Sequence, residues 1–108
     1  MKAIFDHSNY ISTYNPHSPK DPEPRRTTLC AVKKDGKVYL GTACCSEKDQ
    51  FTKERGRNIA MARAMAGGYV QARVWNKLKY RRQTFLYRAM RYFKDVPAKD
   101  FTWEVVED

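Results

Sequence analysis

The sequence predicts an α+β fold in which a small antiparallel β-sheet, centred on an N-terminal hairpin, packs against two C-terminal α-helices on one face. Three observations lead to this prediction. Asp35-Gly36 separates two strand-like runs, apolar residues recur every three to four positions over residues 70–93, and apolar and polar residues alternate over residues 101–106. With 108 residues, the chain is expected to form a single domain, residues 1–108, since two independent cores would be too small.

The predicted hairpin spans residues 28–45. Asp-Gly is a strong signal for a two-residue hairpin loop, because a type I′ turn needs positive φ at both of its central residues. With that loop, Val32 lies opposite Tyr39 and Cys30 lies opposite Gly41. These four residues then share one face of the hairpin, and their neighbours along each strand share the other.

The remaining elements follow from the positions of proline and glycine. Residues 2–5 are expected to start a short strand, and four prolines make residues 13–24 an extended arm or loop. A first helix is predicted over residues 53–66. It ends before Gly67 and Gly68, which suit the left-handed conformation of a C-cap. A second helix is predicted over residues 70–93, and a last strand over residues 101–106.

Residue periodicity predicts which faces the helices bury. In the first helix, the expected interior positions are Ile59, Ala62 and Met65 or Ala66. The second helix carries an apolar stripe made of Val74, Trp75, Leu78, Phe85, Leu86, Ala89, Met90 and Phe93. A helix of 24 residues is about 36 Å long, so it is expected to protrude and to bury its stripe against a second copy of the chain. The sequence therefore favours a homo-oligomer formed through residues 70–93.

Charge is distributed unevenly along the chain. The formal net charge of +9 divides into −1 over residues 1–24, +14 over residues 25–94 and −4 over residues 95–108. Between Glu54 and Asp95 there are eleven lysines or arginines and no carboxylate. Such a segment lacks the opposite-charge pairs that stabilise ordinary surface helices. It therefore favours an anionic partner, a nucleotide or a nucleic acid, over a merely solvated face.

Several classes of protein do not fit the sequence. Mean hydropathy is −0.78, no run approaches the roughly 18 apolar residues of a membrane span, and the N-terminus lacks a signal-peptide core. We therefore expect a soluble cytoplasmic protein without membrane contact. Serine-hydrolase, P-loop, zinc-protease and dinucleotide motifs are absent, and His7 and His17 stand in no pattern typical of a general base. No enzyme activity, catalytic residue or cofactor is expected.

The cysteines do not suggest a metal site. Cys30, Cys44 and Cys45 lack the Cys-x-x-Cys spacing of zinc sites. In the predicted register, Cys30 and Cys45 are too far out of pairing for a disulfide. We expect all three to act as small apolar residues of the sheet.

The stretch most informative about function is residues 51–60, directly after the hairpin. Lys53, Arg55 and Arg57 stand in the first turns of the predicted helix, where the helix dipole disfavours positive charge. Arginine forks at a helix start suit a phosphate, and Gly56 permits a close approach. Further candidate phosphate ligands are Arg81, Arg88 and Arg91, and the candidate stacking residues are Phe51, Tyr80 and Tyr87.

Three short motifs carry a resemblance to a known family. Residues 34–43 read Lys-Asp-Gly-Lys-Val-Tyr-Leu-Gly-Thr-Ala, residues 46–51 read Ser-Glu-x-Asp-x-Phe, and residues 53–64 read Lys-x-x-Gly-Arg-x-Ile-Ala-x-x-Arg-Ala. Together they resemble the Thoeris anti-defence sponges, which are small phage proteins. The resemblance implies an antiparallel sheet, two C-terminal helices and oligomers that bind ligand between subunits.

The same resemblance implies a function. The sponges are non-enzymatic and sequester cyclic ADP-ribose isomers, and some members hold cyclic oligonucleotides. Arg57 corresponds to a ligand-contacting arginine of that family, whereas the family's Asn-x-Asp pattern does not occur in the second predicted helix. A phage protein of this kind would act in the host cytoplasm.

Two other interpretations stay open. A hairpin followed by a basic, alanine-rich helix also resembles the end of a double-stranded RNA-binding domain, although a proline arm stands where that domain has its first helix. The third interpretation is an inhibitor that binds a host defence protein and has no nucleotide affinity. Salt dependence distinguishes a nucleic-acid binder, which contacts several phosphates, from a binder of one small ligand.

Overall fold

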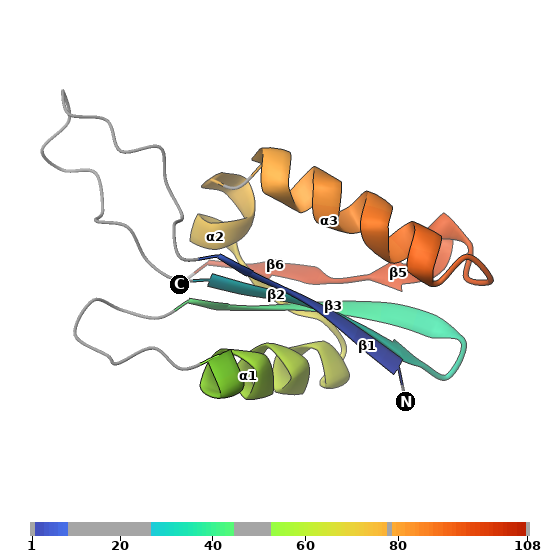
Figure 1. Cartoon of the computed structure of the whole chain (residues 1–108), viewed down its shortest axis with the longest axis horizontal. Helices are drawn as coiled ribbons and strands as arrows, with labels where there is room; N and C mark the ends of the chain where they lie inside the picture. The colour runs from blue at the N-terminus through green and yellow to red at the C-terminus, as the bar shows by residue number, and fades with distance from the viewer. Residues whose placement is uncertain (1, 9–26, 45–52, 78, 108) are drawn as a thin grey trace, which may run out of the picture.

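The computed structural model describes residues 2–8, 27–44, 53–77 and 79–107, which form a six-stranded mixed sheet with helices on both faces (Figure 1). The strands are β1 (Lys2–Ser8), β2 (Thr27–Lys34), β3 (Lys37–Cys44), β4 (Tyr69–Gln71), β5 (Phe101–Thr102) and β6 (Glu104–Val106). The α-helices are α1 (Lys53–Met65), α2 (Ala72–Lys77) and α3 (Lys79–Tyr92), and Ala98–Asp100 form a short 3-10 turn. The predicted arm at residues 13–24 lies outside the described residues.

β1, β2 and β3 form the antiparallel half of the sheet. Val32 pairs with Tyr39, as the two-residue loop predicts. Asp35 and Gly36 have φ angles of 53° and 79°, the positive values that a type I′ turn needs. β1 runs three residues past the predicted start at residues 2–5 and forms one edge of the sheet.

The other half of the sheet is parallel, which corrects the prediction of an antiparallel sheet. β4 pairs in parallel with β3, β6 pairs in parallel with β4, and β5 pairs in parallel with the start of β3. The chain leaves β3, crosses one face as α1 and returns as β4, and such a crossover is the connection that parallel strands require. Gly67 and Gly68, with φ angles of 117° and 91°, reverse the chain after α1.

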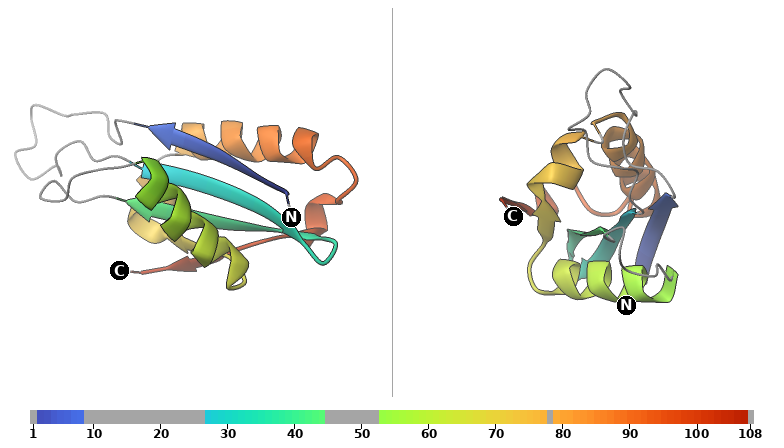
Figure 2. Two further views of the ribbon diagram at one scale, coloured as in Figure 1. Left: turned by 60° about the horizontal axis from the view of Figure 1, so that its bottom comes forward. Right: turned by 90° about the vertical axis from the view of Figure 1, so that its left-hand side faces the viewer.

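The helices lie on opposite faces of the sheet, so they do not share one face as predicted (Figure 2). Side chains alternate along β2. Leu29 and Ala31 pack on the side of α2 and α3, whereas Cys30 and Val32 pack on the side of α1. A sheet that is apolar on both faces needs a cover on each, and the helices divide between them.

α1 buries its smallest residues rather than the predicted interior positions. Gly56, Ala60 and Ala64 are buried. The predicted positions are exposed or half-buried; they are Ile59, Ala62, Met65 and Ala66. β3 approaches the helix closely at Gly41, where an added Cβ would stand 2.1 Å from the carbonyl oxygen of Ala60. Because only small residues permit this approach, size rather than hydrophobicity decides which face of α1 is buried.

The predicted helix over residues 70–93 is divided into β4, α2 and α3. Val70 pairs with Val105 of β6, so strand pairing takes the first residues away from the helix. The apolar stripe still faces the sheet: Val74, Trp75, Phe85, Ala89 and Phe93 are buried, and Leu86 and Met90 pack against them, while Leu78 lies outside the described residues. The stripe is therefore covered by the chain's own sheet and is not left over for a second copy.

The predicted last strand is interrupted at Trp103. β5 pairs with β3, whereas β6 pairs with β4, so the chain steps from one neighbour to the next between them. Trp103 packs against Trp75 of α2 with 5.5 Å between the ring centres. This aromatic contact holds α2 beside the C-terminal strands.

Candidate anion-binding site

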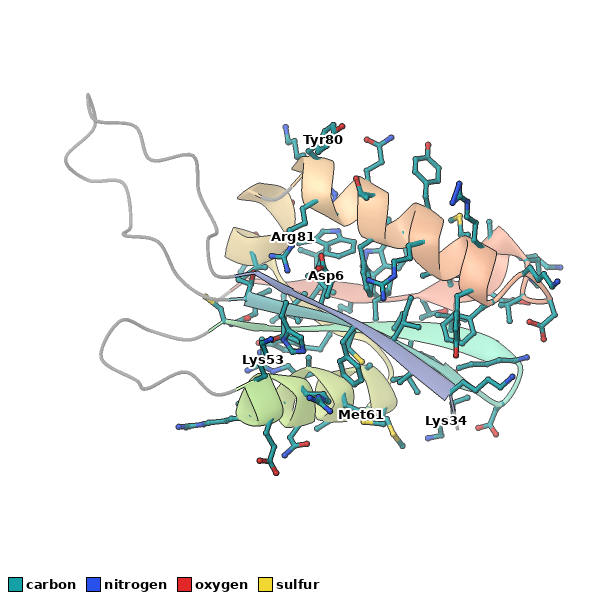
Figure 3. All side chains as sticks on the ribbon, viewed as in Figure 1. Asp6, Lys34, Lys53, Met61, Tyr80 and Arg81 are labelled. Carbon is teal, nitrogen blue, oxygen red and sulfur yellow. The ribbon has the colours of Figure 1, made fainter. Side chains whose placement is uncertain are left out.

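Aromatic and charged side chains meet where the end of β1 lies beside the start of α1. Phe5 and His7 are two positions apart on β1 and therefore share a face, the one that packs against α1. Lys53 and Arg57 are four positions apart on α1 and share a helix face. We call these four residues, Phe5, His7, Lys53 and Arg57, the β1–α1 cluster; Figure 3 shows Lys53 beside the strand end.

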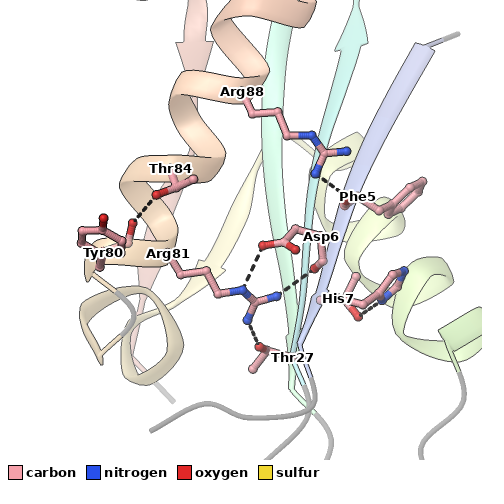
Figure 4. Close-up of polar contacts among 9 residues, drawn as sticks. Phe5, Asp6, His7, Thr27, Tyr80, Arg81, Thr84 and Arg88 are labelled. Carbon is pink, nitrogen blue, oxygen red and sulfur yellow. Dashed lines mark hydrogen bonds and ion pairs between the residues drawn. The ribbon is translucent and has the colours of Figure 1, made fainter. Parts of the chain in front are cut away.

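The cluster has a defined geometry. The guanidinium carbon of Arg57 lies 5.6 Å from the centre of the Phe5 ring, within the range of a cation–π contact. The rings of Phe5 and His7 are inclined by 9° with 6.2 Å between their centres. Nδ1 of His7 lies 3.0 Å from Oγ1 of the buried Thr28 on β2 (Figure 4). The Phe5 ring therefore lies beside both the guanidinium of Arg57 and the imidazole of His7.

The electrostatics of the cluster favour an anion. Burial lowers the pKa of His7 below its ordinary value, and the positive charges of Arg57 and Lys53 lower it further. The carboxylate of Asp6 acts in the opposite direction. His7 is therefore neutral at neutral pH, and the cluster presents two cations beside a neutral imidazole.

Arg81, a predicted phosphate ligand, is bound within the chain on the opposite face of the sheet. Its Nε donates to the Asp6 carboxylate at 2.9 Å, its Nη2 donates to the Asp6 carbonyl oxygen at 3.1 Å, and its Nη1 donates to Oγ1 of Thr27 (Figure 4). The Arg81 side chain is 19% exposed. These bonds tie α3 to β1 and β2.

The other predicted residues are spread over two faces. Arg88 donates to the carbonyl oxygen of Phe5 at 3.1 Å, from the α3 side of β1. Tyr80, Tyr87 and Arg91 are exposed on α3, with Tyr80 85% exposed. Figure 3 places Tyr80 across the sheet from Lys53, so one copy of the chain does not bring Tyr80 to the cluster. Arg55 is exposed on α1, and Phe51 lies outside the described residues.

Phe5 and His7 are the cluster residues that the sequence analysis did not select. Their alternation along a strand was the available signal, but nothing local indicates that this strand end lies beside residues 53–57. The sequence patterns bear on His7 only as a general base, whereas the structure places it where the charges of Arg57 and Lys53 act on it.

The structure describes two of the three cysteines, Cys30 on β2 and the half-buried Cys44 on β3. Cys30 is fully buried, and burial raises the pKa of its thiol to about 12, so the thiol stays protonated and unreactive. Within residues 2–8, 27–44, 53–77 and 79–107, no group of three or more histidine, cysteine or acidic side chains is placed to hold a metal ion.

Comparison with known proteins adds no relative. No family model, curated protein or solved structure matches this chain. Among the helices of the described residues, none combines the length and the apolar composition needed to cross a membrane.

Proposed function

We propose that this protein is a non-enzymatic binder that sequesters a nucleotide-derived cyclic signalling molecule, with a phosphate of the ligand at the β1–α1 cluster. The observation that carries the proposal is that Phe5 lies beside both Arg57 and His7, while the charges of Arg57 and Lys53 both act on His7. The resemblance of residues 29–65 to the Thoeris sponges supports the ligand class, a cyclic ADP-ribose isomer or a cyclic oligonucleotide. The same resemblance implies that the protein is encoded by a phage and acts in the host cytoplasm.

The cluster offers complementary contacts for a phosphate. Arg57 presents a planar fork that can bond two phosphate oxygens, and Lys53 adds a point charge. The Phe5 ring lies under the guanidinium and restricts the conformations of Arg57 before a ligand binds. Arg57 therefore loses less conformational entropy on binding. A neutral imidazole adds one N–H donor.

The rest of the ligand would be held by residues outside the cluster. Phe51 precedes Lys53 by two positions in the sequence and is the nearest stacking candidate along the chain. Tyr80, Tyr87 and Arg91 are exposed on the other side of the sheet. They would reach a ligand at the cluster from a second copy, which is the arrangement that the sponge resemblance implies.

A second candidate function is binding of double-stranded nucleic acid. The observation that favours it is the order of elements, because three antiparallel strands lead into a helix that crosses the sheet and opens with exposed cations. This is similar to the end of a double-stranded RNA-binding domain, whose basic helix start contacts phosphates. In this case the exposed cations of α1, Lys53, Arg55 and Arg57, would follow the phosphate backbone.

The first prediction concerns Arg57. We expect protein purified from bacteria with active immune signalling enzymes to release a near-stoichiometric cyclic nucleotide on heat denaturation, measured by mass spectrometry. Arg57→Ala should release at least about tenfold less, because one charge-assisted contact contributes about 1.5–3 kcal/mol. Lys99→Ala removes an equal charge from an exposed position in the 3-10 turn and is the matched control.

Salt dependence decides between the two candidates. The nucleic-acid function predicts binding to an RNA duplex of about 16 base pairs. A plot of log affinity against log salt concentration should then have a slope of several units, and Arg57→Ala should reduce its magnitude by about one. Release of a small cyclic nucleotide without duplex binding favours sequestration. If neither ligand binds, the remaining interpretation is an inhibitor that contacts a host defence protein.

A further inference from the structure

We infer that His7 contacts the phosphate of the ligand and takes up a proton when the phosphate binds. This inference rests on the proposed phosphate site and adds a proton-linked preference to it. It stands on the position of the imidazole, which lies beside the Phe5 ring that Arg57 covers and is anchored to β2 by Thr28.

The anchor leaves one ring nitrogen for a ligand. The hydrogen bond to Thr28 fits either tautomer of a neutral His7, and we place the ring proton on Nε2, so that Nδ1 accepts the hydroxyl proton of Thr28. When His7 is protonated, Nδ1 donates to the same hydroxyl oxygen, which can also accept. The bond to Thr28 therefore survives protonation, and Nε2 is a donor in both states.

Charged groups from three elements act on the pKa of His7, those of α1 from its own face of the sheet and the others from the opposite face. They are Lys53 and Arg57 on α1, Asp6 on β1 and Arg81 on α3, while β2 contributes the uncharged Thr28. Arg81 is already paired with Asp6. The cations that a bound anion would neutralise are therefore Lys53 and Arg57, the two that disfavour a positive charge on His7 most. An anion placed against them makes the imidazolium favourable.

The direction in which ligand affinity depends on pH follows from this change in the pKa of His7. In the free protein the pKa of His7 lies below its ordinary value. The bound anion raises it, so between the two pKa values binding takes up one proton. Affinity is highest below the free-protein pKa, decreases as the pH rises, and becomes constant above the pKa of the complex. Each unit between the two pKa values corresponds to about a tenfold difference in affinity.

The experiment follows the ring protons of the two histidines, His7 and His17, by NMR as the pH is varied. Titrations are run in sulfate and in chloride at equal ionic strength, because sulfate stays a dianion throughout and adds no proton of its own. We expect the His7 pKa to be about one unit or more higher in saturating sulfate, with His17 as the internal reference. Arg57→Gln should remove at least about half of this rise, and Lys99→Gln, the control, none of it.

Each other outcome has a definite meaning. Saturable sulfate shifts at the backbone amides of the cluster with an unchanged His7 pKa would overturn the inference and leave the proposed phosphate site standing. Absence of saturable shifts at the cluster would count against the site itself. An equal rise at His7 and His17, or a rise that persists in Arg57→Gln, would identify a general salt effect and would also overturn the inference.

Discussion

At the scale of single residues, β1 receives side chains from both faces of the sheet. Arg57 of α1 lies against Phe5 on one face, and Arg81 of α3 bonds to Asp6 on the other. Because neighbouring residues of a strand point to opposite faces, β1 places the Phe5 ring against Arg57 on one face and the Asp6 carboxylate against Arg81 on the other. The two arginines therefore have different roles, a candidate ligand contact for Arg57 and an internal tie for Arg81.

The structural role of Arg81 gives a prediction about stability. Arg81→Met should lower the free energy of unfolding by about 1–2 kcal/mol, because the Asp6 carboxylate and the Thr27 hydroxyl lose a charged donor in a partly buried position. Urea denaturation followed by circular dichroism measures this. Arg91→Met, at an exposed position of the same helix, should change stability by less than about 0.5 kcal/mol. Equal stabilities of the two variants would show that the Arg81 contacts do not stabilise the fold.

At the scale of elements, the contact between α1 and β3 depends on small residues. Gly41 stands where an added Cβ would be 2.1 Å from the Ala60 carbonyl oxygen and 2.7 Å from the Ala64 backbone nitrogen. Both atoms belong to the helix backbone, so a rotamer change cannot relieve the clash. In a variant with a larger residue at this position, the helix must move away from the sheet or the protein does not fold.

Gly41→Ala is therefore predicted to destabilise the protein by about 2 kcal/mol or more, measured by thermal and urea denaturation. Gly36→Asn is the matched control, since it lies in open space and asparagine tolerates the positive φ of the hairpin loop. The control should cost less than about 1 kcal/mol. A Gly41→Ala variant as stable as the control would mean that α1 lies farther from β3 than described.

At the scale of the whole molecule, the two layers of helices decide which parts of the sheet are most protected. β2 and β3 lie inside the sheet and carry buried residues on both faces. β1 and β6 form the two edges, and Val105 of β6 is 43% exposed. Local opening is easiest where few buried contacts must break, so the edges should open before the centre.

We predict that amide hydrogen exchange, measured by mass spectrometry, is slowest in β2 and β3 and faster in β1 and β6. In Arg81→Met, exchange in β1 should increase several-fold more than exchange in β4, because Arg81 bonds to Asp6 of β1. Equal acceleration in β1 and β4 would point instead to a uniform loss of stability.

The sequence by itself determined the features that depend on residues close together in the chain. The register of the hairpin follows from the Asp-Gly loop, and the reversal after α1 follows from two glycines that adopt positive φ. The uneven charge and the cations at the start of α1 are also properties of the chain alone. Local patterns of this kind act within a few residues, so they do not depend on the rest of the fold.

Only the tertiary structure decided how these pieces meet. The parallel pairing of β4 with β3 turned the start of a predicted helix into a strand, because sheet hydrogen bonds and burial outweigh helix periodicity over so few residues. The close approach at Gly41 selected the small-residue face of α1. His7 and Arg57, fifty positions apart, share one cluster because α1 covers the face of the sheet to which His7 of β1 points. Proximity of this kind results from long-range packing, which no local pattern encodes.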